Sequence, residues 1–129
     1  MNRILSLIGV VLVVGCGPEP RNIETLLEVD GLYMNPVDGQ PYSGPVFEMD
    51  GDGSRGTGSL KDGKLDGTVE TYYENGQLRE KGPFKDGVPD GPTEGYYENG
   101  QLWMKGTYKD GEKCGEWLED GETVTYDPC

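Results

Sequence analysis

The chain has 129 residues, with 24 acidic and 11 basic side chains, and its formal net charge is −13. So acidic a surface repels nucleic acid and anionic membrane headgroups. It has no histidine and only three cysteines, which removes the commonest general base and argues against a zinc site. The composition therefore favours a protein that is not an enzyme and needs no cofactor.

The first residues predict an export signal. Arg3 precedes an apolar run from Ile4 to Val14, which is too short to span a bilayer. The run ends in Val-Val-Gly-Cys, which resembles the lipobox of bacterial lipoproteins, where cleavage precedes a cysteine that carries lipid. We therefore expect residues 1–15 to be a lipoprotein signal peptide, Cys16 to be lipidated, and residues 16–26 to form a flexible tether. The alternative is an ordinary secretory signal that happens to end in cysteine.

The residue after the cysteine bears on location. In bacterial lipoproteins an aspartate at this position favours retention in the inner membrane, whereas this chain has Gly17. The resemblance implies a lipid-anchored protein of the cell envelope, in the outer membrane if the source is Gram-negative.

The segment after the tether allows two interpretations. Asn22 followed by Ile23, Leu26 and Leu27 fits a single helical turn, whereas residues 27–34 around Asp30-Gly31 fit a first hairpin. We expect the folded domain to cover residues 27–129.

That domain repeats itself with a period of 24 residues. Residues 61–84 and 85–108 are identical at 15 of 24 aligned positions, and the shared residues are turn formers, tyrosines and charges. Asp-Gly pairs recur at the same interval before and after these copies. We count four units, at about residues 37–60, 61–84, 85–108 and 109–129, of which the first is irregular and the last is shortened.

Each regular unit contains an Asn-Gly and an Asp-Gly pair, which favour two-residue hairpin loops. Two such turns in 24 residues predict two strands per unit, and hence an all-β, open antiparallel sheet or solenoid of successive hairpins. A tight loop at Asn-Gly also predicts the cross-strand partners. These are Glu70 with Lys81, Tyr72 with Arg79, Tyr73 with Leu78, and in the next unit Glu94 with Lys105, Tyr96 with Trp103, and Tyr97 with Leu102.

Alternation along the strands then assigns the two faces. We expect one side to be the more buried; it comprises Tyr73, Leu78, Phe84, Tyr97, Leu102 and Tyr108. The other side would present Tyr72, Tyr96 and Trp103 as a partly exposed aromatic row among charges. This row is a candidate contact surface for protein or glycan. The alternative is that it only packs over the second face of the sheet.

Two cysteines lie in the terminal unit. Once Cys16 is assigned to lipid, Cys114 and Cys129 remain, and disulfides persist in exported proteins. A bridge would close a loop of about 16 residues and stabilise the end unit by roughly 3 kcal/mol. The alternative is two free thiols.

With no histidine and with Cys114 and Cys129 expected to form a disulfide, a catalytic site in this chain would have to use carboxylates. They recur in turns and strands, where solvated faces and turn formation explain them better than a pair of catalytic carboxylates does. Asp50-Gly51-Asp52-Gly53-Ser54 resembles the start of a calcium loop, but Arg55 and Lys61 occupy positions where an EF-hand needs glycine and glutamate. We predict no metal site and no catalytic residue.

The repeats YYENGQLREKGPFKDG and YYENGQLWMKGTYKDG resemble the variant MORN repeats of bacterial proteins described as YwqK-type antitoxins. The resemblance spans roughly residues 27–126. It implies a sheet of antiparallel hairpins that binds other macromolecules, in some members as a toxin neutraliser. MORN repeats elsewhere are linked to membrane and phosphoinositide contact, which the export signal and the acidic charge of this chain oppose.

These observations favour a non-enzymatic, lipid-anchored envelope protein that acts as a scaffold or adaptor for another protein, and the acidic charge favours a basic partner. The expected contacts are Tyr72, Tyr96 and Trp103, with Glu74 and Glu98 at the turns. One alternative is an antitoxin or immunity protein that neutralises a basic toxin. Another is an architectural surface lipoprotein with no specific partner.

Overall fold

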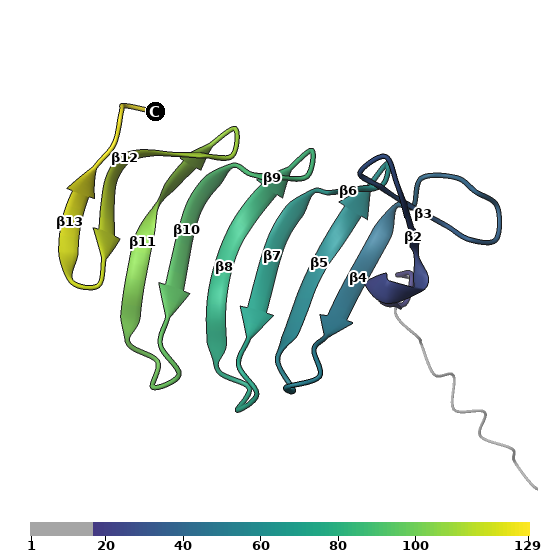
Figure 1. Ribbon diagram of the computed structural model, residues 1–129, viewed down its shortest axis with the longest axis horizontal. Helices are drawn as coiled ribbons and strands as arrows, with labels where there is room; N and C mark the ends of the chain where they lie inside the picture. Colours follow the sequence, from purple (N-terminus) through teal and green to yellow (C-terminus); the bar gives the residue numbers. More distant parts are fainter. Residues whose placement is uncertain (1–16) are drawn as a thin grey trace, which may run out of the picture.

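The structure, a computed structural model, describes residues 17–129, so the expected signal peptide and lipidation site at Cys16 lie outside the described residues. The described chain is built almost wholly from strands (Figure 1). Its elements are β1 (Arg21–Asn22), the 3-10 turn η1 (Ile23–Thr25), β2 (Leu27–Val29), β3 (Leu32–Met34), β4 (Gly44–Met49), β5 (Arg55–Lys61), β6 (Lys64–Leu65), β7 (Gly67–Tyr72), β8 (Leu78–Lys85), β9 (Val88–Pro89), β10 (Gly91–Tyr96), β11 (Leu102–Lys109), β12 (Glu112–Glu119) and β13 (Glu122–Thr125).

The strands form one open sheet, as the sequence predicts. Its order is β1-β4-β5-β7-β8-β10-β11-β12-β13, with the short strands β6 and β9 attached to β5 and β8, and β2 pairs with β3 in a separate hairpin. All neighbours run antiparallel except β1, which runs parallel to β4. Apart from β1, strand order follows chain order, so each repeat contacts only its neighbours.

Two different turns join the strands. At Asp62-Gly63 both residues have positive φ, 50° and 80°, which is the two-residue loop that the sequence predicts. At Asn75-Gly76 only the glycine has positive φ, 82°. There the Tyr73 carbonyl accepts from Gly76 N–H and Tyr73 N–H donates to the Gln77 carbonyl, both at 2.9 Å, so the loop has three residues.

The longer loop shifts part of the predicted register. The pairs Glu70 with Lys81 and Glu94 with Lys105 are confirmed. Nearer the loop the prediction is wrong: Tyr72 lies opposite Leu78, and Tyr96 opposite Leu102. The loop includes one more residue of the tyrosine strand than predicted. A bulge in the return strand restores the register, and its extra residue is Arg79 in one unit and Trp103 in the next.

Partners across an antiparallel ladder lie on the same face, so the register defines two faces. The capped face contains a row that alternates glycine with larger residues. The row is Val46, Gly58, Val69, Gly82, Thr93 and Gly106. The open face contains the next row along the strands. It is Phe47, Thr57, Glu70, Lys81, Glu94 and Lys105.

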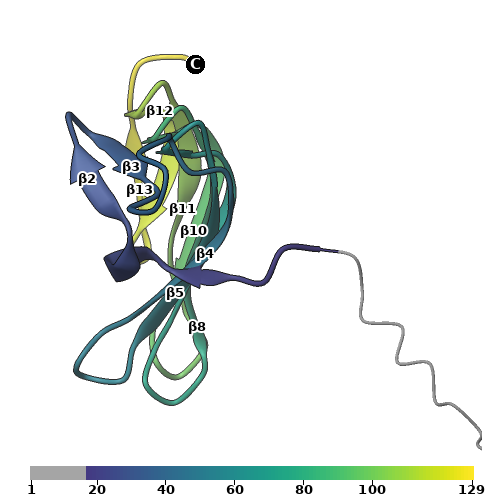
Figure 2. The same cartoon turned by 90° about the vertical axis from the view of Figure 1, so that its right-hand side faces the viewer.

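The capped face is covered at its N-terminal end. Leu26, Val46 and Leu60 are buried together, and Ile23 and Tyr33 pack against them from η1 and β3. Asn22 caps η1 by accepting from Glu24 N–H at 3.0 Å, so the helical turn and the hairpin both form. Residues expected to belong to the tether are therefore structured from β1 onward. Figure 2 shows the β2–β3 hairpin on one side of the sheet and the chain before β1 leaving on the other.

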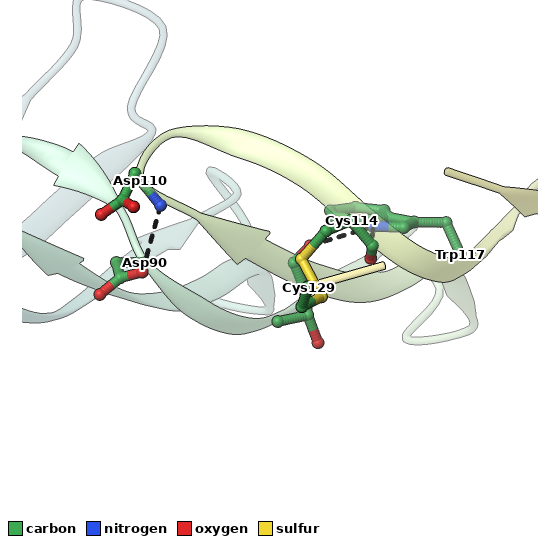
Figure 3. The surroundings of a disulfide bond; sticks show 6 residues. Asp90, Asp110, Cys114, Trp117 and Cys129 are labelled. Carbon is green, nitrogen blue, oxygen red and sulfur yellow. Dashed lines mark hydrogen bonds between the residues drawn. A yellow bond between two sulfur atoms is a disulfide. The ribbon is translucent and has the colours of Figure 1, made fainter. Parts of the chain in front are cut away.

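The C-terminal end of the same face is closed by Trp117, which has no exposed surface. Its ring lies over Gly106, where an added Cβ would come within 2.1 Å of the indole, so no larger residue fits there. The indole N–H donates to the Thr107 and Cys114 carbonyls, each at 3.1 Å (Figure 3). The predicted disulfide joins Cys114 to Cys129 beside this ring.

The predicted core is wrong in part. Tyr97 and Leu102 are 42% and 37% exposed, and the bulges place Leu78 and Leu102 on the open face, opposite Tyr72 and Tyr96. The buried hydrophobic side chains lie mainly at the two ends of the sheet. They are Leu26, Val46, Leu60, Met104, Cys114 and Trp117.

Candidate functional site

The open face carries the larger hollow, of about 780 Å³, near the N-terminal end of the sheet. Phe47, Met49, Arg55 and Tyr72 line it, and Pro20 borders it from the segment before β1. The Arg55 guanidinium lies 4.8 Å from the centroid of the Tyr72 ring, within the range of a cation–π contact. Met49 is 58% exposed, so apolar surface here is open to solvent.

Tyr72 is held in place by an acidic neighbour on its own strand. Its hydroxyl donates to Glu70, which also accepts from Lys81 at 3.0 Å. These two donors hold the pKa of the Glu70 carboxyl below its usual range, and the tyrosine bond has the larger effect. The same bond raises the pKa of the Tyr72 hydroxyl. Tyr96 repeats the arrangement one unit later by donating to Glu94.

The predicted aromatic row does not form. Tyr72 and Tyr96 lie on the open face, but Trp103 turns to the capped face, because it is the extra residue of a bulge. Gly95 lies on the capped face, on the opposite side of the strand from Tyr96. A Cβ added to Gly95 would lie 2.8 Å from the Trp103 indole nitrogen, so the Trp103 ring is on the capped face. Trp103 instead lies near Tyr97, with ring centroids 6.5 Å apart.

The acidic hairpin tips project from one edge of the sheet. Glu74 and Glu98 are exposed, and the Asn75 amide bridges their loops by donating to the Glu98 carbonyl at 3.4 Å. These two predicted contact residues are thus on neighbouring loops, but apart from the tyrosines on the open face.

In the loop at residues 50–54, the aspartate side chains accept hydrogen bonds from within the loop. The Ser54 hydroxyl donates to Asp50 at 2.9 Å and to Asp52 at 2.7 Å, and Ser54 N–H donates to Asp52 at 2.9 Å. These bonds from Ser54 lower the pKa of the Asp52 carboxyl. Among residues 17–129 no three potential metal-ligating side chains cluster.

A second, smaller hollow of about 170 Å³ lies in the middle of the capped face. Val69, Phe84, Pro89 and Tyr108 supply its apolar walls. The caps at either end of the sheet leave it uncovered. It differs from the open-face hollow because one of its lining side chains, Thr93, has a buried hydroxyl without a partner in the described chain.

Thr93 is 4% exposed, and its hydroxyl has no hydrogen-bond partner in the described chain. It lies on the floor of the hollow, above Gly82. One period earlier and one period later the same position holds Val69 and Trp117. An unpaired buried hydroxyl costs about 1–3 kcal/mol, so folding alone does not explain a threonine here.

Glu80 is half-buried on the same face and pairs with Thr71 in the ladder. Within the described residues its carboxylate makes no ion pair or side-chain hydrogen bond. The equivalent residues one period away are Gly56 and Met104. Neither Glu80 nor Thr93 is among the site residues predicted from the sequence. Comparing the repeats position by position would have found them, because each puts a polar group where neighbouring units have glycine or an apolar residue.

Residues 65–86 and 89–110 match the MORN repeat variant family. The two matched segments are 24 residues apart and contain β7, β8, β10 and β11, so these two repeats are similar to MORN repeats. Such repeats often mediate interactions with proteins or membranes and are generally not catalytic. No curated protein matches the chain. The part of the chain from residue 17 onward contains no helix that is long and apolar enough to cross a bilayer.

Proposed function

We propose that this chain is a non-enzymatic, lipid-anchored envelope protein that binds another protein through the uncovered middle of its sheet. The observation that carries the proposal is the capped-face hollow, where apolar walls surround a buried hydroxyl and a carboxylate that lack partners. A one-layer sheet normally buries one face against another layer. Here residues 17–129 cover only the two ends of that face, and a partner would cover the rest.

The proposed anchor is lipid on Cys16, with the sheet close to the membrane. Residues 17–20 form no strand and leave the sheet beside β1, which suits a short spacer (Figure 2). Labelling cells with a radioactive fatty acid tests this step. Label on the wild-type protein that is lost in Cys16→Ser supports the anchor, and an unlabelled wild-type protein contradicts it.

A second candidate function is neutralisation of a basic toxin, which would place the protein among antitoxin or immunity proteins. The net charge of −13 and the exposed carboxylates at the hairpin tips favour a basic partner. This function requires binding at a fixed ratio to one product and rescue of growth. An architectural surface protein would show neither.

The test is affinity capture from the source organism with the chain from residue 16 onward, carrying Cys16→Ser and an intact disulfide. We expect one protein to be retained at a fixed ratio. Glu74→Lys with Glu98→Lys should weaken capture at low salt, because these tips add attraction at long range. Glu116→Lys with Glu122→Lys is the control of equal charge, on exposed positions of the last two strands. Retention of nothing beyond a mock column would contradict protein binding and favour the architectural role.

A further inference from the structure

We propose that the capped-face hollow is a recognition site for a lysine or arginine side chain that the partner protein inserts. The inference rests on the proposed protein-binding function and adds the chemistry of the contact. It names a cation-binding site formed by Glu80 and Thr93 in the middle of the sheet.

The size of the hollow limits what can enter. Sites for drug-sized molecules occupy roughly 300–1,000 Å³, whereas a cavity of about 150 Å³ accepts one benzene-sized group. At about 170 Å³ this hollow has room for one side chain and no more. The adjoining hollow toward the N-terminal end is smaller, about 100 Å³, and is bordered by Ile23 and Leu65. On the other side the fully buried Trp117 closes the face.

The charge inside the hollow selects a cation. The Glu80 carboxylate lies on a mainly apolar face, and the basic groups near it in sequence are engaged elsewhere. Lys81 points to the open face and pairs with Glu70 at 3.0 Å. The Arg79 guanidinium lies 5.7 Å from the centroid of the Tyr73 ring. A cation from outside would therefore give Glu80 the partner that the described chain does not supply.

The walls and the floor fit the rest of such a side chain. Lysine and arginine lay an aliphatic stem on apolar surface while the charged head reaches a polar group. Val69, Phe84 and Tyr108 provide that surface, and the rings can also attract the charge. Thr93, whose hydroxyl is unpaired at the floor, can accept a hydrogen bond from the ammonium or guanidinium group.

The first test uses three capped peptides, Ala-Ala-X-Ala-Ala, with X as lysine, norleucine or glutamate. They are titrated into the ¹⁵N-labelled chain from residue 16 onward, and backbone amide shifts are recorded. We expect saturable shifts at Glu80, Gly82 and Thr93 with lysine only. Glu80→Gln should weaken this binding about tenfold or more, since a charge-assisted bond is lost. Glu116→Gln, an exposed carboxylate on the next-to-last strand, should leave it unchanged.

Other outcomes overturn the site. Equal shifts with norleucine would mean a purely apolar hollow, and equal weakening by Glu116→Gln would mean nonspecific charge attraction. No shift at the three amides would remove the site altogether.

Thr93→Val separates a binding role from a purely structural one. Valine has nearly the shape of threonine and occupies the equivalent position at Val69, so the variant should fold and melt at a higher temperature than wild type. A binding role predicts that lysine-peptide affinity falls several-fold in spite of this. Unchanged affinity would exclude Thr93 from the site. The proposed function is tested separately from this site. A captured partner that is retained equally by the Glu80→Gln variant would refute this inference alone. Lysine-peptide binding without any captured partner would refute only the proposed function.

Discussion

The N-terminal end of the capped face is covered by a turn and a separate hairpin, and the C-terminal end by one tryptophan in a unit that carries a disulfide. At the first end η1 and the β2–β3 hairpin bury Leu26 against Val46 and Leu60. At the other end Trp117 covers Gly106, and a disulfide ties Cys114 to the terminal residue Cys129. The β2–β3 hairpin forms its own small sheet, whereas β13 continues the main sheet by pairing with β12.

The difference shows how a repeat array ends. An end unit has only one neighbour, so its apolar face needs a dedicated cover. The N-terminal end obtains that cover from η1 and the β2–β3 hairpin, and the C-terminal end obtains it from one large side chain, Trp117, whose indole N–H donates to the carbonyl of the disulfide-bonded Cys114. Between the two the glycine-containing row of the capped face remains open, and there the proposed partner site lies.

The largest expected effect is at Trp117. Trp117→Ala removes a side chain with no exposed surface and should lower the free energy of unfolding by about 3–5 kcal/mol. Chemical denaturation of both proteins measures this. Trp103→Ala, a half-buried tryptophan on the same face, should cost much less. Equal losses for the two variants would mean that Trp117 does not hold the C-terminal end.

Leu60→Ala tests the other end. Leu60 is 3% exposed in the apolar cluster, so the variant should lose about 2–5 kcal/mol. The loss should persist under reducing conditions, because no disulfide acts at this end. Leu102→Ala, at 37% exposure, is the control and should cost little. A Leu60→Ala protein as stable as wild type in thermal and urea melts would show that the N-terminal cluster contributes nothing.

Removing the cross-link should affect one end only. Cys114→Ser with Cys129→Ser opens a loop with a sequence separation of 15 and should cost about 2–4 kcal/mol. Hydrogen exchange should then quicken in β12 and β13 while β4 and β5 stay protected. Uniformly faster exchange along the sheet would contradict independent closure of the two ends.

The smallest effect concerns acid stability. The pKa of Glu70 is depressed in the folded state, so its contribution is present at neutral pH and is lost as the pH falls below the ordinary value of 4.5. Glu70→Gln should therefore reduce stability by less than about 1 kcal/mol at pH 7 and by less at pH 2 than at pH 7. The measurement compares the melting temperatures of wild type and Glu70→Gln at pH 7 and at pH 2, with Glu98→Gln as an exposed control.

The turn residues made much of the fold predictable. The Asp-Gly pairs at residues 62–63, 86–87 and 110–111 gave the correct two-residue loops, and the charged pairs Glu70 with Lys81 and Glu94 with Lys105 gave the correct register away from the Asn-Gly loop. The disulfide followed from the position of two cysteines in the last unit. Each prediction rested on a local rule or on the repeat itself.

The errors began at one loop. The Asn75 side chain accepts from Gln77 N–H at 2.9 Å, and Asn75 itself does not take the positive φ that a two-residue loop requires. The extra loop residue moved Leu78 and Leu102 to the open face and Trp103 to the capped face. An Asn-Gly pair is compatible with both loop lengths, so sequence alone did not distinguish them.

The candidate site was harder to predict than the fold. Comparing the repeats marks Glu80 and Thr93 as unusual, but only the structure shows that both line one hollow. Which part of the capped face stays uncovered depends on where the two end caps stop, and this is a property of the assembled sheet.

The most direct test of the central claim is photo-crosslinking in the source organism from the middle of the capped face. A benzoylphenylalanine at Thr71, which borders the hollow, is compared with one at Val124, which is exposed on the edge strand β13. We expect one adduct of defined mass from position 71, reduced by Glu80→Gln, and none from position 124. No adduct from position 71, or the same set of adducts from both positions, would contradict a protein-binding site on this face.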